Sequence, residues 1–186
     1  MKIKLLLLSL LFFPVLVFAA LPHWDIVPAE SKIIFTGTQN NSPISGEFKK
    51  FSGEIKGDLD QLPQSSVTIT IDTNSLAVSY KELEDALKTT DWFNPAAFPK
   101  ATFTADQFKK IGGNTYRAIG KLTILDVTIP LKITLILESY TKTKARVSGE
   151  TTIKRSSFGI GKGEWASTDE IKDDVKINFV ITAVKK

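Results

Sequence analysis

Hydrophobic and polar positions alternate along most of the chain beyond residue 30. In one such run, Val67, Ile69 and Ile71 alternate with threonines. The same period of two marks the runs 116–124, 131–137, 145–153 and 175–183. Successive side chains of a β-strand point to opposite faces, so each run has one apolar face and one more polar face. The pattern therefore predicts a protein built mainly from β-strands.

Turn-forming residues separate these runs. They lie at 58–60, 112–114, 126 and 161–163. Further runs near 31–39, 44–57 and 100–109 bring the total to about eight strands, joined by short links that favour antiparallel neighbours. Such strands can close into a barrel or stack as a sandwich. We favour the barrel because closure removes exposed sheet edges.

One segment departs from the period of two. Ser79 and Glu82 match the capping box that starts many helices, and Val78 and Leu83 match its hydrophobic staple. A short helix is therefore expected at about 80–89.

The first 19 residues have the features of a signal peptide. Lys2 and Lys4 precede an apolar run of 14 residues, and Val17 and Ala19 place small residues at the spacing that favours cleavage after Ala19. The run is shorter than the roughly 20 residues that span a bilayer. We therefore expect a signal peptide at 1–19, secretion of the mature chain, and one domain at 20–186.

Composition narrows the class of protein further. The chain has no cysteine, which excludes thiol catalysis, cysteine-based metal sites and a lipoprotein anchor. Removing Lys2 and Lys4 lowers the 24 basic residues to 22, against 20 acidic ones, and so small an excess gives no reason to expect nucleic acid.

The residues that carry catalysis are scarce. His23 is the only histidine and lies near the expected new N-terminus, a poor position for a catalytic triad or a zinc site. The glycines at 159, 161 and 163 lack the strand and helix of a phosphate-binding loop, so they indicate a turn. The acidic residues at 169–174 do not have the spacing of an EF-hand and are expected to be hydrated. We expect a protein that is not an enzyme and holds no metal or cofactor.

Small residues fall on the faces that would point into a barrel. They are Gly37, Gly53, Ala101, Ala118, Gly120 and Gly149. Inward side chains normally fill a small barrel, so small residues there would leave an apolar cavity. The alternative is that the glycines mark bulges and bends. The pattern alone leaves both interpretations open.

Several motifs occur in the same order as in a known family. They are Trp24 to Phe35, Gly46 to Gly53, Asp91 to Pro99, Gly120 to Pro130 and Arg155 to Ile160. Together they resemble the YceI-like family of polyisoprenoid-binding, lipocalin-like proteins from Trp24 to Lys186. The resemblance implies an eight-stranded antiparallel barrel that holds an isoprenoid lipid, such as a quinone tail, along its axis in the periplasm. It also implies a homodimer in several members.

The resemblance and the alternation together suggest a cavity wall. Its expected residues are Phe35, Phe48, Phe51, Ile69, Phe93, Phe103, Leu122, Ile133 and Phe179. Gln39, where many relatives have histidine, and Arg155 are the candidate contacts for a lipid head group. For Arg155, we favour the alternative of a partner in a nearby loop. Asp126 replaces a glycine of the family's hairpin turn, so the preferred head group is open. Trp92, Phe93 and Phe98 either contact the lipid or plug one end of the barrel.

Two other functions remain in view. One is a barrel with a filled core that assists a membrane redox partner through its surface. The other is an outer-membrane barrel, which would need longer lipid-facing strands than this sequence offers.

Overall fold

The computed structural model describes residues 20–186, and the expected signal peptide at 1–19 lies outside the described residues. Eleven strands form one sheet: β1 (His23–Ile26), β2 (Lys32–Gln39), β3 (Ser42–Phe48), β4 (Phe51–Lys56), β5 (Ser66–Asp72), β6 (Leu76–Val78), β7 (Lys100–Gly112), β8 (Thr115–Ile124), β9 (Val127–Tyr140), β10 (Lys144–Lys154) and β11 (Asp174–Lys185). The helices are α1 (Lys81–Leu87) and the short 3-10 turns η1 (Pro28–Glu30), η2 (Leu59–Gln64), η3 (Thr73–Ser75), η4 (Arg155–Phe158) and η5 (Gly163–Trp165).

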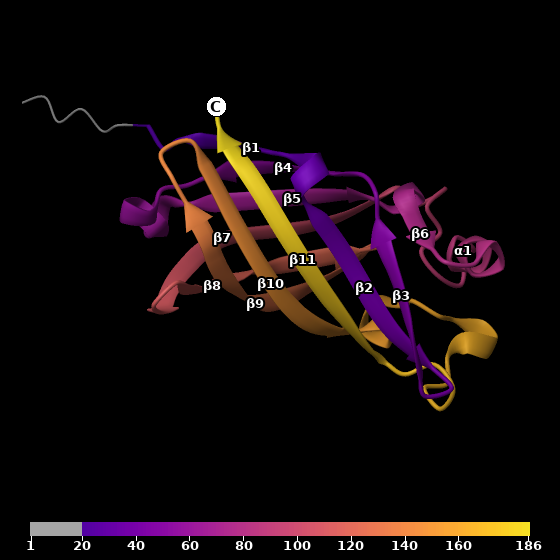
Figure 1. Ribbon diagram of the computed structural model, residues 1–186. Coiled ribbons are helices and arrows are strands. Elements are labelled where there is room, and N and C mark those ends of the chain that lie inside the picture. Colours follow the sequence, from indigo (N-terminus) through magenta and orange to yellow (C-terminus); the bar gives the residue numbers. More distant parts are fainter. Residues whose placement is uncertain (1–19) are drawn as a thin grey trace, which may run out of the picture.

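The sheet closes into an eight-membered antiparallel ring, as expected (Figure 1). The ring runs through β1, β4, β5, β7, β8, β9, β10 and β11, and β1 closes it by pairing with both β4 and β11. β1 and β2 both pair with β11, one after the other along its length. Trp24 of β1 is opposite Lys185, and Phe35 of β2 is opposite Ile177. β3, which comes just before β4 in the chain, pairs with β2. The ring excludes the sandwich.

The helix lies where expected, but its start differs. Tyr80 is the N-cap residue of α1 and makes no side-chain cap, so the capping box at Ser79 was wrong. Val78 is paired with Gly46 in β6, which keeps the chain extended almost up to the helix. The helix is instead supported by ion pairs one turn apart, such as Lys88 to Glu84 at 2.8 Å.

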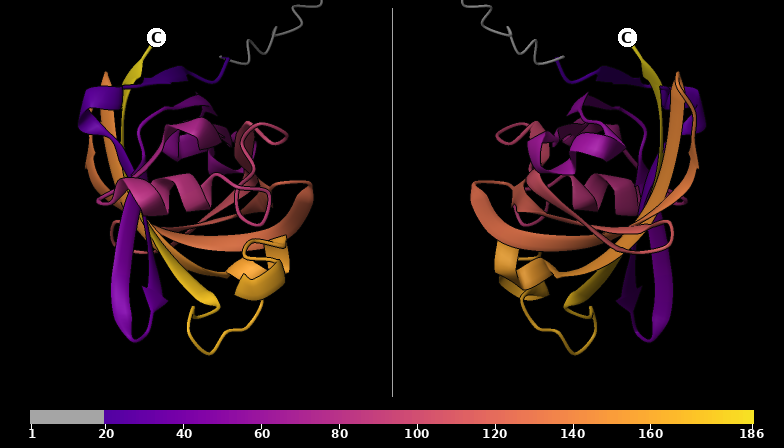
Figure 2. Two further views of the ribbon diagram at one scale, coloured as in Figure 1. Left: turned by 90° about the vertical axis from the view of Figure 1, so that its right-hand side faces the viewer. Right: turned by 90° about the vertical axis from the view of Figure 1, so that its left-hand side faces the viewer.

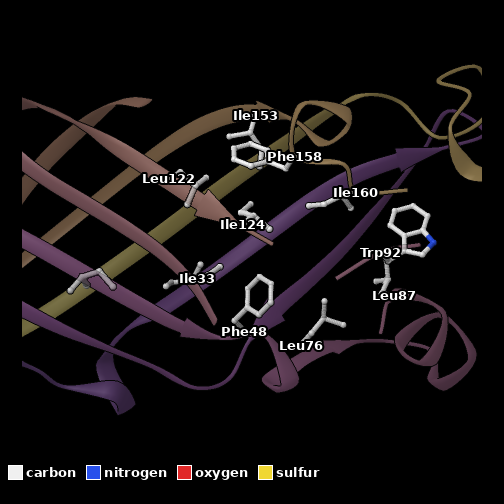
Figure 3. Packing of buried hydrophobic residues seen from close by; sticks show 12 residues of the cluster. Ile33, Phe48, Leu76, Leu87, Trp92, Leu122, Ile124, Ile153, Phe158 and Ile160 are labelled. Atoms are coloured by element: carbon white, nitrogen blue, oxygen red, sulfur yellow. The ribbon is translucent and has the colours of Figure 1, made fainter. Parts of the chain in front are cut away.

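The barrel has two different ends. The hairpin end carries η2, the turns at 113–114 and 141–143, and the last residues of β11; η2 lies at the left of Figure 1. The helix end carries α1, the chain that follows it, and the connection 155–173, and α1 lies across this end in the left panel of Figure 2. Most of the buried apolar cluster, including Leu87, Trp92, Phe158 and Ile160, gathers at the helix end (Figure 3).

Candidate functional site

An apolar cavity of about 430 Å³ runs through the barrel. Its wall extends from Leu59 and Tyr140 at the hairpin end to Trp92 and Ile160 at the helix end. Apolar side chains form nearly all of it, and its volume falls within the range of about 300–1,000 Å³ typical of small-molecule sites. An apolar space that extends from one end of the barrel to the other suits a hydrocarbon chain.

The structure places most of the expected wall residues around this cavity. Those that line it are Phe35, Phe48, Ile69, Phe93, Phe103, Leu122, Ile133 and Phe179. Phe51 is the exception among the nine, because it does not line the cavity. It is the first residue of β4, lies opposite Ile71 and packs against the buried apolar cluster. Contact of the eight with a ligand stays a prediction.

The small residues divide into two groups. Gly37, Ala101 and Ala118 line the cavity, and a methyl group added at Gly37 would have no atom within 4 Å. Gly53, Gly120 and Gly149 do not line it, which corrects the expectation for these three.

Close approach of a neighbour explains the second group. A methyl group at Gly120 would lie 2.0 Å from the Thr104 carbonyl oxygen, and one at Gly53 would lie 2.6 Å from Ile26 Cδ1. These positions require glycine because other groups occupy the space, whereas Gly37 opens the lumen. The cavity interpretation therefore holds for Gly37, whereas Gly53 and Gly149 lie at regularly paired strand positions, and close packing rather than a bulge or bend explains them.

Aromatic rings form the cavity wall near the helix end. The rings of Phe35 and Phe48 lie 5.6 Å apart, and Phe48 meets Phe93 edge to face at 5.7 Å. Trp92 is buried, and its ring centroid lies 6.1 Å from that of Trp165, with the two ring planes tilted. Both tryptophans line the cavity. Phe98 does not line it. Trp92 and Phe93 thus close this end and form the cavity wall there at the same time.

Arg155 is buried, with 2% of its surface exposed, beside the ring of Trp92. Its guanidinium donates five hydrogen bonds of 2.8–3.3 Å, to the carbonyl oxygens of Ile160, Gly161, Ser167, Ile171 and Lys172. A guanidinium has five N–H donors, so none remains for a lipid head group. The position of Arg155 is structural: it holds the connection 155–173.

Gln39 lines the cavity at the helix end, where its backbone forms a bridge to Ile171. Among residues 20–186, no hydrogen bond uses its side-chain amide, so the amide is available to a polar group inside the cavity. Its head-group contact stays a prediction. Asp126 lies in the β8–β9 turn, where Leu125 rather than Asp126 takes the left-handed conformation, with φ of 55°.

The sequence did not reveal the wall at the hairpin end. Trp24, Tyr116 and Tyr140 line the cavity there. Leu137 is opposite Val147 and Tyr140 is opposite Ala145, so β9 carries one extra residue and its alternation changes phase. Burial and the nearby carboxylate of Asp58 raise the pKa of Tyr140, which keeps its phenol neutral.

The other candidate sites have structural roles. Gly159, Gly161 and Gly163 all have positive φ, as the turn interpretation predicted.

Within residues 20–186, no cluster of three or more potential metal ligands occurs. None of the helices in this part of the chain has the length and apolar character needed to span a membrane.

The profile of the YceI-like domain matches residues 24–183. The chain belongs to the YceI-like family. It is 32% identical over 122 residues to the UPF0312 protein ECA1782 of Pectobacterium atrosepticum, a match that spans 63% of each chain. It is 30% identical over 142 residues to the protein YceI of Salmonella arizonae, which covers 74% of each.

Solved structures show the same architecture. BcnA of Burkholderia cenocepacia superposes with a TM-score of 0.81 and 34% identity, covering 85% of this chain and 99% of BcnA. A domain from Saccharophagus degradans, described as polyisoprenoid-binding and implicated in plant cell wall breakdown, superposes with a TM-score of 0.72 over 88% of this chain and 98% of that domain. At 16% identity, this second likeness concerns the fold alone.

Proposed function

We propose that this YceI-like protein binds an isoprenoid lipid, such as a polyprenyl or quinone tail, inside its barrel and carries or stores it in the periplasm without chemical change. The observation that carries the proposal is the apolar cavity of about 430 Å³ along the barrel. A filled core, as the alternative regulatory barrel would have, leaves no such space. The homodimer and a transient contact with a membrane redox partner remain expectations of the same proposal.

The energetics favour a hydrocarbon occupant. An apolar cavity loses contacts when nothing fills it, and water gains few hydrogen bonds from carbon walls. A lipid tail that moves from water into the cavity gains about 25 cal/mol for each Å² hidden from water. The polyisoprenoid-binding description of the Saccharophagus domain supports the same class of ligand by fold analogy.

The direct test is to purify the protein without detergent from its natural compartment and measure its mass under native conditions. We expect an added mass of isoprenoid size, and extraction into organic solvent followed by mass spectrometry then identifies the lipid. Repeatedly bare protein that also fails to take up added isoprenoids would contradict lipid binding and favour the regulatory barrel.

A second readout comes from the tryptophans. Trp24, Trp92 and Trp165, the three tryptophans of the chain, all line the cavity. A quinone that enters should therefore quench the intrinsic fluorescence in a saturable manner. Single Trp→Phe variants would show whether the quinone ring lies near Trp24 at the hairpin end or near Trp92 and Trp165 at the helix end.

A further inference from the structure

The two ends of the barrel differ in how firmly they are closed. At the helix end, the connection 155–173 is hydrogen-bonded to the barrel on one side: Asn40 N donates to Glu170 O at 2.8 Å, and Lys172 N donates to Thr38 O at 2.9 Å. On the other side, the N–H groups of Gly161 and Lys162 both donate to the carbonyl of Asp91, at 2.7 and 2.9 Å.

The interior of this connection is held as firmly as its edges. Arg155 links five of its carbonyl groups, and Phe158 and Ile160 are buried beneath it. A lipid that passed this end would have to break these bonds and leave buried carbonyls without partners, which is costly. The helix end is therefore the closed end of the cavity.

The hairpin end exposes apolar side chains. Residues 20–186 expose five large hydrophobic side chains, and four of them belong to this end: Ile111 (47%), Ile136 (45%), Tyr140 (40%) and Val184 (37%). Ile111 adjoins the β7–β8 turn, and Ile136 is opposite Thr115 on the other side of it. Tyr140 also lines the cavity, so one of these exposed side chains reaches the lumen.

Lysines surround these apolar residues. Lys56 lines the cavity, and Lys142 and Lys185 line the surface groove beside Tyr140. Lys109 and Lys110 immediately precede Ile111. These five lysines form no ion pair within 4 Å among the described residues, unlike Lys144, which pairs with Glu30 at 2.8 Å.

Two carboxylates also lie in the groove. Asp58 and Asp60 line it on the η2 side, and the Asp58 carboxylate accepts the backbone N–H of Asp60 at 3.0 Å as the cap of η2. The acidic groups of the groove are therefore confined to η2 and its cap, whereas the five lysines follow the ends of β4, β7 and β11 and the β9–β10 turn. Three other carboxylates at this end, Asp25, Glu30 and Glu138, are paired with Lys186, Lys144 and Arg146.

We infer that the hairpin end is the mouth of the cavity and docks on the surface of an anionic phospholipid bilayer. Lysines attract anionic head groups, while isoleucine and tyrosine side chains enter the boundary between head groups and acyl chains. Docking in this orientation would let a water-insoluble tail pass from the bilayer into the lumen without crossing water. The inference builds on the proposed lipid binding, but docking itself does not require a filled cavity.

The test uses residues 20–186, which contain the whole closed barrel and avoid the apolar segment at 5–18. Flotation with vesicles of phosphatidylethanolamine and phosphatidylglycerol should recover the protein, and vesicles of phosphatidylcholine alone should recover much less. The double variant Lys142→Glu/Lys185→Glu should lower the partition coefficient at least about tenfold, and added salt should weaken wild-type binding. Ile111→Ser/Ile136→Ser should also lower it.

Matched variants at the helix end provide the control. Lys50 and Lys100 are exposed lysines there without an ion pair among the described residues, and Tyr80 is 71% exposed. Lys50→Glu/Lys100→Glu and Tyr80→Ser should leave partitioning unchanged. Equal losses from both ends, or no binding to anionic vesicles, would overturn the inference.

Two further measurements keep the outcome clear. Urea unfolding must show that each variant is folded, and quinone quenching without vesicles reports the cavity alone. Intact quenching with unchanged vesicle binding in the hairpin-end variants overturns docking and leaves lipid binding in place. Light scattering without vesicles tests whether the apolar residues at this end instead join two copies of the chain. A dimer formed through these residues would also overturn the inference.

Discussion

Phe35 on β2 lies with its ring against the backbone of Gly46, its direct partner on β3. A methyl group on residue 46 would come within 2.4 Å of Cζ of that ring. Phe179 and Gly149 repeat the arrangement across β11 and β10, at 2.5 Å. In both pairs the glycine lets a large ring lie flat along the wall, so two phenylalanines line the lumen without filling it.

The first prediction concerns this arrangement. Gly46→Ala should push the Phe35 ring into the lumen, because the atoms nearest to the new methyl group belong to the side chains of Phe35 and Val78 and not to the backbone. We expect lipid affinity to fall about tenfold and stability to fall by about 1–3 kcal/mol, the usual cost of overpacking. Quinone quenching and urea unfolding measure the two effects.

A compensating variant serves as the control. Gly46→Ala combined with Phe35→Leu removes the displaced ring and should recover most of the affinity. If the single variant binds as tightly as the wild type, the flat ring does not determine the free volume.

The second prediction uses two glycines that both have free space around them. Gly37→Phe should abolish lipid uptake with little loss of stability, because residue 37 lines the cavity and no atom lies within 4 Å of the added Cβ. Gly112→Phe introduces the same side chain at another open strand position outside the cavity wall, and uptake should persist. Native mass spectrometry after loading compares them; equal uptake by both variants would place the lipid elsewhere.

The third prediction concerns Arg155. Arg155→Met should destabilise the fold by about 3–5 kcal/mol, because five carbonyl oxygens at the helix end lose a charged donor. Arg155→Lys should be nearly as harmful, since an ammonium group has three donors and cannot match the planar geometry.

Its neighbour Lys154 provides the comparison. The Lys154 side chain is 62% exposed, so Lys154→Met should cost less than about 1 kcal/mol in urea unfolding. A well-folded Arg155→Met protein of unchanged stability would show that the connection 155–173 does not depend on this side chain.

The fourth prediction is a dependence of stability on pH. Burial alone would raise the pKa of Asp173, but hydrogen bonds from Ser156 and the charges of Lys154 and Arg155 outweigh it and lower the pKa below its ordinary value. A carboxyl group with a lowered pKa stabilises the folded state above its unfolded pKa, near 3.9, and this contribution disappears as the pH falls through the folded value. Stability should therefore decline below about pH 4.5.

Asp173→Asn isolates this contribution. The variant should be less stable than the wild type at pH 7, and the difference should shrink as the pH approaches 3, as followed by the urea midpoint. A difference that stays constant across this range would rule out titration of Asp173 as its source.

Alternation and turn residues predicted about eight antiparallel strands, because both report local geometry, but they left a barrel and a sandwich open, and the family resemblance implied the eight-stranded ring. The run expected at 44–57 is two strands, β3 and β4, in the structure. The wall residues Ile69 and Leu122 follow from the same alternation, helped by family resemblance. The pattern could not show that Gly37 opens the lumen while Gly120 meets a carbonyl, because each depends on the partner strand. It also could not place Tyr140, since the extra residue in β9 changes the phase of the alternation.

The role of Arg155 was hidden for a related reason. All five of its acceptors lie in the irregular connection 155–173, so no periodic pattern brings them together in advance. Sequence reasoning left a lipid head group and a partner in a nearby loop as alternatives for Arg155, and it could not show that the chain itself uses every donor.

The pairing of β11 with both β1 and β2 has a kinetic consequence. Contacts between the first and last strands of a chain form late, because a long loop must close before they are made. The lumen has no wall along this seam until β11 is in place. On the proposed function, the barrel can therefore take up a lipid only after its C-terminal strand has been made and has paired.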